Sequence, residues 1–492
     1  MRHRSMHKIY ENKTYAVNRA SSDRIASHAE FHVSFVYAAL AIALTVGFGY
    51  AAVLAFLIGF DLPLGDWLVS ALQAHGHAQL RGWAGLFIVG VSLHFIPRMA
   101  GAPLRFPRLL PWTCGLLAGG VGLRATAQPL LDVYAGGPVR LALRWGMGGA
   151  ALMEAAGVGL YLLLIVTTMR RSEVDRPAMR PVRPLLVTAL IGWGLSTLLA
   201  TCLSLGAALD DRSVLDLAWN RFGAELYLGL VLLPVGMAFS VRTFPLYLRL
   251  SAPRWPVRPV AGLYLFGFAL ERLPELLSLA GLLSSDGGTR TLLSGAGRGI
   301  KGAALIWFVW ELDILLRRKA PWTVERVGEP EPDRKKTREG LPDYGEFGRF
   351  ERLLYAAYVW LFVAAGLDVG GGVTMMLKGA LPAHADAVRH AYLAGFISLL
   401  ILGMAPRMIP GFVHVRRLAH PGLVNATFYL AGFAAFFRVT PLLLPGDLIG
   451  RFPLLARGST YAFGLSGMLG WAATAALAWN LIATVGQRKE ET

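Results

Sequence analysis

Two histidines, His75 and His77, stand at the start of an apolar stretch that runs from residue 74 to residue 97. A polar side chain inside a lipid bilayer costs free energy, so it is found there with a partner or with a function. The neutral imidazole ring is the commonest metal ligand among protein side chains. The pair therefore raises the question of whether this stretch holds a metal.

The second of these histidines belongs to a pattern that recurs along the chain. A polar residue is followed 17 positions later by a basic residue and 20 positions later by a proline. The three copies are His77–His94–Pro97, Glu225–Arg242–Pro245 and His390–Arg407–Pro410. His77 and His94 are about 25 Å apart along a helix, so they cannot share one metal ion. The pattern instead places His77, Glu225 and His390 at one equivalent depth in three helices.

The composition of the chain indicates which elements position these residues. Of 492 residues, 55% are hydrophobic and only 16% are charged, and the mean hydropathy is +0.49. A soluble protein carries about a quarter charged residues. Apolar runs of roughly 20 residues, long enough to cross a bilayer as a helix, recur along most of the chain. The sequence therefore predicts an all-α membrane protein.

Twelve transmembrane helices are predicted, and the polar pattern occurs in the second, sixth and tenth of them. The predicted spans are 31–60, 74–97, 111–128, 139–169, 184–208, 216–242, 259–283, 297–317, 350–371, 387–410, 421–444 and 457–486. Four spans separate successive copies of the pattern. We therefore expect three units of four helices in a pseudo-threefold arrangement.

The distribution of charge predicts the topology. The net charge is +17, and the basic residues gather in the N-terminal arm and in every second loop. The positive-inside rule then places both termini in the cytoplasm. Because this topology accounts for the basic residues, a nucleic-acid partner is not expected. The expected divisions are a basic arm (1–30), helices one to four (31–170), helices five to eight (171–316), a flexible cytoplasmic loop (317–349), helices nine to twelve (350–486) and a cytoplasmic tail (487–492).

Histidines at equal depth on two helices suggest a haem site. Haem iron takes axial ligands from opposite faces, and His77 and His390 meet that need. Arg140 and Arg144 flank the outer mouth and are candidates to meet the haem propionates. His75 lies about 200° around the helix from His77, so it is assigned to a second metal, to a propionate or to water at the helix mouth. Small residues near the histidines leave room for a macrocycle, although they would also serve close helix packing.

Glu225 lies at the depth where its repeat partners carry histidine. A buried carboxylate there is expected to be protonated, to pair with Arg221 four residues earlier, to bind a metal or to relay protons. Glu271, Arg272 and Glu275 stand near the middle of the seventh span. They are interpreted as an internal ion pair or as part of a proton path.

The predicted architecture resembles subunit I of the haem–copper oxidases and nitric oxide reductases. The resemblance implies that His77 and His390 hold a low-spin haem. Two positions depart from the family pattern: Val388 stands where the family has a second helix-ten histidine, and Glu225 stands where a helix-six histidine binds copper. A complete haem–copper binuclear centre is therefore not expected.

Two segments resemble a distant relative of those oxidases, the NnrS family, which is associated with nitric oxide stress. They are HGHAQLRGWAGLFIVG (75–90) and RHAYLAGFISLLILGMAPRM (389–408). The resemblance implies haem b and copper as cofactors. It also implies metal ligation by histidines in these two segments.

We therefore expect a haem b protein of the NnrS type in the bacterial cytoplasmic membrane. Its expected partners are nitric oxide or another small gas, the lipid bilayer, and a quinol or cytochrome as electron donor. The residues leave open whether it transfers electrons or acts as an oxidoreductase on nitric oxide. One alternative is a cofactor-free secondary transporter, in which intramembrane Glu–Arg pairs are common. Another is a divergent terminal gas reductase subunit, against which the missing copper ligands argue.

Overall fold

A lipid environment leaves the backbone no partner except itself, so apolar spans fold as helices. The computed structural model describes residues 31–134, 136–171, 179–251, 254–282, 287–320, 343–379 and 385–487. This part of the chain is helical and has no strands. The predicted arm (1–30), most of the loop (317–349) and nearly all of the tail (487–492) lie outside the described residues.

Some spans are built from consecutive helical segments. The first is α2 (Val33–Ile42), η1 (Ala43–Gly47) and α3 (Phe48–Gly59), and the second is α4 (Leu68–His77), η2 (Ala78–Gly85) and α5 (Leu86–Ala100). The sixth is α9 (Leu217–Tyr227), η4 (Leu228–Leu232) and α10 (Leu233–Tyr247), and the tenth is α14 (Ala385–His390), η5 (Ala391–Ser398) and α15 (Leu399–Phe412).

The other elements are single helices. They are η3 (Pro107–Leu109), α6 (Leu110–Val133), α7 (Gly137–Met169), α8 (Arg183–Leu209), α11 (Val257–Leu279), α12 (Gly287–Leu312), α13 (Phe350–Lys378), α16 (Leu423–Leu443), α17 (Gly446–Arg451) and α18 (Pro453–Gln487).

Nine helical stretches in the described part of the chain are long and apolar enough to cross a membrane, judged by length and composition. They coincide with nine of the twelve predicted spans, and they make this a multi-pass membrane protein. The other three predicted spans correspond to α6, α11 and α12, which are long helices that contain more polar residues. That these three also cross the membrane stays a prediction.

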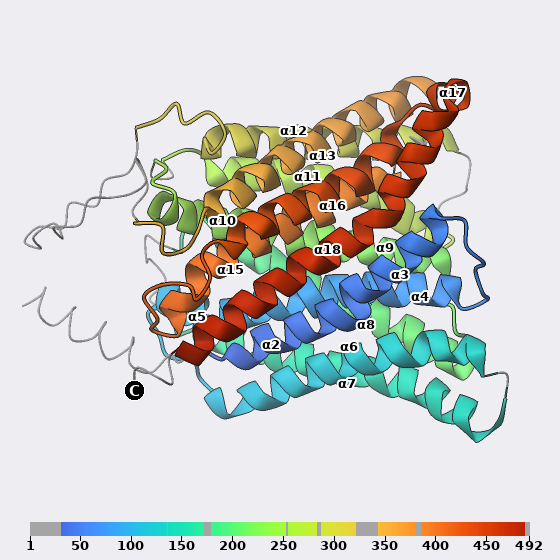
Figure 1. Cartoon of the computed structure of the whole chain (residues 1–492), viewed down its shortest axis with the longest axis horizontal. Coiled ribbons are helices and arrows are strands. Elements are labelled where there is room, and N and C mark those ends of the chain that lie inside the picture. Colours follow the sequence, from blue (N-terminus) through green and yellow to red (C-terminus); the bar gives the residue numbers. More distant parts are fainter. Residues whose placement is uncertain are drawn as a thin grey trace, which may run out of the picture.

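The helices form one bundle along the long axis of the molecule (Figure 1). Labels α4 and α9 lie near one end of the bundle, and α5 and α10 lie near the other, so the second and sixth spans run in the same direction; α15, the end of the tenth span, lies at the same end as α5 and α10. The start of α2 and the end of α18 lie at the same end. This agrees with the predicted placement of both termini on one side, while the identity of that side stays a prediction.

Each of the three helices with the polar pattern contains a π-helical segment next to the patterned residue. The π segment η2 begins directly after His77, and η5 begins directly after His390. In the sixth span, η4 begins three residues after Glu225. A π segment inside an α-helix is uncommon and is frequent at functional sites. The three patterned helices therefore share a backbone feature, which the first span also has at η1.

Two glycines allow α11 and α12 to pack with their backbones almost in contact. A Cβ atom on Gly297 would lie 2.3 Å from the backbone nitrogen of Glu271, and one on Gly267 would lie 2.5 Å from that of Lys301. Both distances are below van der Waals contact, so only glycine fits. This close approach is what brings charged residues of the two helices within reach of each other.

Gly297→Ala is therefore expected to lower the free energy of unfolding by about 1–3 kcal/mol, the usual cost of overpacking. Gly299 lies on the same helix with nothing within 4 Å of an added Cβ, so Gly299→Ala is the matched control. Equilibrium unfolding in mixed detergent micelles measures both. Equal stability of the two variants would contradict the close approach of α11 and α12.

Candidate functional site

A large cavity lies among the helices that carry the predicted histidines. Its volume is about 550 Å³, within the range of ligand and cofactor pockets. Its walls come from α3, α4, η2, α6, α8, α9, α14, η5, α16 and α18. His75, His77 and His390 all line it. The second and tenth spans thus both contribute histidines to one cavity, and their role as metal ligands stays a prediction.

His75 leaves one ring nitrogen available to the cavity. Its Nδ1 lies 3.0 Å from the carbonyl oxygen of Gly47. A carbonyl only accepts, so Nδ1 carries the proton and Nε2 of the neutral ring keeps its lone pair. Within the described residues, Nε2 has no hydrogen-bond partner. This is the state in which an imidazole binds a metal.

His390 is held in the same way. Its Nδ1 donates to the backbone oxygen of Asp386 at 2.9 Å, and a carboxylate oxygen of the same residue lies 3.3 Å away. Its Nε2 also has no hydrogen-bond partner in the described part of the chain. His75 and His390 line the same cavity from α4 and α14. A hydrogen bond from the second ring nitrogen to a carbonyl or carboxylate is the usual support of a metal-bound histidine.

His77, which the sequence analysis paired with His390, is held differently from these two rings. Its Nε2 lies 2.8 Å from Oε1 of Glu154, and its Nδ1 accepts from Arg124 at 2.9 Å. All three side chains are buried, at 8% exposure for His77, 5% for Glu154 and 2% for Arg124. Both ring nitrogens are therefore occupied by protein groups, and none is left for iron. His75 provides the free imidazole instead.

Arg140 and Arg144 do not line the cavity. The Arg140 guanidinium contacts the Asp211 carboxylate at 3.1 Å and donates to the carbonyl of Leu131 at 2.7 Å. The Arg144 side chain donates to the carbonyls of Ala208 and Leu209. Arg140 thus ties α7 to α6 and to the loop after α8, and Arg144 ties α7 to the end of α8. The structure does not support their assignment to haem propionates.

Other arginines line the cavity in their place. They are Arg81, Arg124, Arg221, Arg389 and Arg438. Arg81 donates to Thr197 Oγ1 at 2.7 Å, and its guanidinium lies 5.1 Å from the centre of the Tyr227 ring. The sequence did carry a signal for these residues, because an arginine inside an apolar span needs a buried partner or an anionic ligand.

Glu225, for which metal binding was one of the predicted roles, is engaged in ion pairs in the structure. Its carboxylate oxygens lie 3.1 Å from Arg389 Nε and 3.2 Å from Arg272 Nη2. The expected partner Arg221 is not among these contacts; both partners come from other helices. Arg272 also contacts Glu271 at 3.1 Å and Glu275 at 2.8 Å, as the internal ion-pair interpretation predicted. No group of three His, Cys, Asp or Glu residues within the described ranges converges as a metal site.

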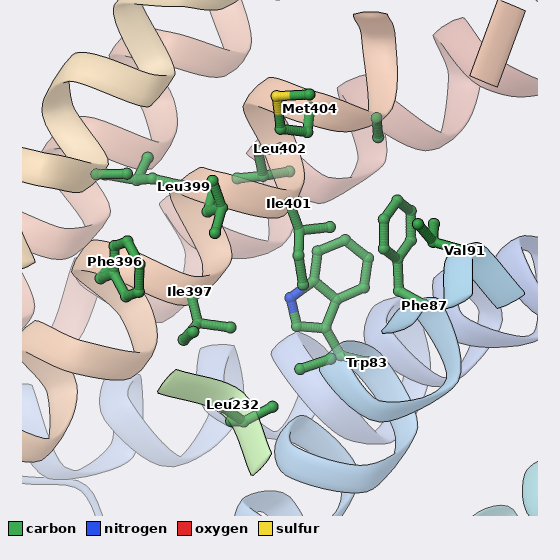
Figure 2. Packing of buried hydrophobic residues seen from close by; sticks show 14 of the residues in the cluster. Trp83, Phe87, Val91, Leu232, Phe396, Ile397, Leu399, Ile401, Leu402 and Met404 are labelled. Carbon is green, nitrogen blue, oxygen red and sulfur yellow. The ribbon is translucent and has the colours of Figure 1, made fainter. Parts of the chain in front are cut away.

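A second, smaller cavity lies where α5, α7, α8, α10 and α15 meet. Its volume is about 120 Å³, and its lining is almost entirely apolar. Figure 2 shows part of its wall, with Phe87 and Val91 on one helix and Ile401 and Met404 on another. The Ser92 hydroxyl in the wall already donates to the carbonyl of Val89 at 2.9 Å. The larger cavity, with its histidines and arginines, is therefore the candidate functional site.

The comparison with known proteins concerns the fold. No family model matches the sequence, and no curated protein matches it. Among solved structures, a heme-copper terminal oxidase dimer studied by cryo-EM is similar, with a TM-score of 0.63 and 14% identity. The match covers 95% of this chain and 84% of that chain. The chain therefore has the fold of a heme-copper terminal oxidase.

Proposed function

We propose that this chain is a haem b protein of the NnrS type, in which His75 and His390 would hold the haem iron. The observation that carries the proposal is the pair of imidazoles in one cavity, each with Nδ1 bound to a backbone carbonyl and Nε2 free. A haem held there would supply a one-electron couple, and a gas-binding position whenever an axial ligand is displaced.

The charge of the cavity fits a doubly anionic ligand. Arg389 is paired with Glu225. The other cavity arginines are Arg81, Arg124, Arg221 and Arg438, and the carboxylates of Glu154 and Asp386 are the acids next to the cavity. Four cations against two anions leave an excess of two positive charges. Haem carries two propionates, and arginine is the side chain best suited to pair with carboxylates.

Residues of the chain hold and orient the ligand. The carbonyls of Gly47 and Asp386 fix the tautomer and the rotation of the two rings, so both lone pairs are ready before the ligand enters. Arg81 and Arg124 are anchored by Thr197 and His77, which keeps their charge at the cavity wall. Copper is not part of this proposal, because the described residues provide no three-ligand cluster.

With two histidines holding its iron, the haem would be suited to electron transfer. The proposed location is the bacterial cytoplasmic membrane, and the proposed electron source is a quinol or a cytochrome. Reaction with nitric oxide is the second function we propose, and it rests on the resemblance of residues 75–90 and 389–408 to the NnrS family. It requires that one histidine leave the iron.

The test is a pyridine haemochrome assay and a reduced-minus-oxidised spectrum of the purified protein, with and without nitric oxide. We expect one haem b per chain with a low-spin spectrum. Bands that do not change with nitric oxide support electron transfer, and bands that shift support gas binding. Protein that contains no haem after expression with ample haem supply contradicts the proposal and favours a transporter.

A further inference from the structure

A continuous series of ion pairs connects His390 with the interior of the neighbouring helices. We call it the charge lattice. Its members are Asp386, Arg389, Glu225, Arg272, Glu271, Glu275, Lys301, Asp368 and Arg298. They come from α14, α9, α11, α12 and α13. The candidate haem site therefore has a row of ion pairs on one side, which runs from the half-exposed Asp386 to the buried Asp368.

Asp386 is the member of the charge lattice that contacts the candidate haem ligand His390. One carboxylate oxygen of Asp386 lies 3.3 Å from Nδ1 of His390, and the other lies 3.3 Å from Nη1 of Arg389. Arg438 approaches the same carboxylate at 3.7 Å. The negative charge beside the His390 ring is therefore offset by two cations.

Arg389 forms ion pairs with two carboxylates. Besides Asp386 it contacts Glu225 through Nε at 3.1 Å, and Glu225 in turn contacts Arg272 at 3.2 Å. The side chains of Arg389 and Glu225 are 25% and 14% exposed, so solvent screens these interactions only in part. A change at Glu225 therefore alters how strongly Arg389 neutralises Asp386.

His75 differs from His390 in what its donating nitrogen contacts. Its Nδ1 donates to the neutral carbonyl of Gly47. The two candidate axial rings thus differ, because only His390 has a carboxylate oxygen within 3.3 Å of the donating nitrogen. A carboxylate near that nitrogen raises the basicity of a ligating imidazole, and a more basic ligand stabilises the more positive metal.

We propose that Asp386 is a positioning residue for the His390 ring, and that its charge, offset by Arg389 under the control of Glu225, sets the reduction potential of the haem. This inference rests on the proposed function. It predicts that removing the Asp386 charge favours reduced iron, whereas removing the opposing Arg389 charge favours oxidised iron.

The test is a potentiometric titration of the haem-loaded protein and three variants. Asp386→Asn removes the charge but keeps the backbone carbonyl that holds His390, so haem content should persist. We expect its oxidised-to-reduced ratio at a fixed potential to fall about tenfold, which is an upward shift of about 59 mV for one electron. Glu225→Gln should shift the midpoint in the same direction, and Arg389→Gln should shift it in the opposite direction.

Opposite signs distinguish an electrostatic role from a structural one, because general loosening of the site would shift all variants alike. Asp211→Asn, which affects a pair outside the cavity, is the matched control and should leave the potential unchanged. Variants that keep their haem and the wild-type potential overturn this inference and leave the proposed function standing. Wild-type protein without haem overturns both. If Asp386→Asn loses its haem, the directions in which Glu225→Gln and Arg389→Gln shift the midpoint potential test the inference: opposite shifts support it, and equal or absent shifts overturn it.

Discussion

Replacement of either His75 or His390 by alanine is expected to abolish the low-spin haem spectrum, whereas His77→Gln is expected to retain it. Each alanine removes a ring whose free Nε2 faces the cavity. His77 uses both nitrogens for Glu154 and Arg124, and a glutamine amide can still donate and accept there. The measurement is haem content together with the optical spectrum of the purified variants.

Added imidazole provides the control for this experiment. A small free ligand can enter the space left by the missing ring, so imidazole should restore a six-coordinate spectrum in the two alanine variants. It should have no effect on His77→Gln. Loss of the spectrum in His77→Gln with retention in His75→Ala would contradict the structure and return the ligand role to His77.

The helical framework was predictable from sequence because the bilayer leaves so little choice. Apolar length alone predicted the spans 139–169 and 184–208, and the structure has helices at Gly137–Met169 and Arg183–Leu209. The inward placement of His390 was also predictable, since an isolated histidine in an apolar helix avoids lipid. Each copy of the pattern has a basic residue at +17 and a proline at +20, and this repeat singled out the three helices in which π segments follow His77, Glu225 and His390.

The choice between His75 and His77 was beyond sequence reasoning for a physical reason. Two residues separate them by about 200° on a regular helix, so the sequence suggested that only one faces the cavity. In the structure both rings line it, and a π segment begins directly after His77. What distinguishes them is their partners, since Gly47 lies in the first span and Glu154 in the fourth. No spacing along a single helix reveals such contacts.

The ion pairs were only partly predictable for a related reason. Sequence reasoning favours partners one helical turn away, which suggested Arg221 for Glu225. The actual partners are Arg389, 164 positions away, and Arg272, 47 positions away. An unpaired carboxylate inside the membrane is costly, so the sequence predicts that Glu225 pairs with a cation. Which helix provides that cation depends on how the whole bundle packs.

The charge lattice leads to a second large expected effect, which concerns stability. Asp368 is 1% exposed and lies 2.8 Å from Arg298, 3.1 Å from Lys301 and 2.7 Å from the Tyr392 hydroxyl. Asp368→Asn keeps the size of the side chain but removes the negative charge that neutralises Arg298 and Lys301. We expect a loss of about 3–5 kcal/mol in the free energy of unfolding, the usual cost of breaking a buried ion pair. Equilibrium unfolding in mixed micelles measures it.

Two further variants make the measurement decisive. Asp210→Asn removes one partner of an exposed pair, with Arg212 at 2.5 Å, and should change stability little because solvent screens it. Lys301→Met combined with Asp368→Asn removes one cation with the anion and should recover part of the loss, as expected for coupled neighbours. If Asp368→Asn is as stable as the wild type, water already screens these charges. The charges of the lattice would then interact too weakly for Glu225 to affect the environment of His390. The stability experiment therefore tests, without haem, the electrostatic interactions on which the redox inference depends.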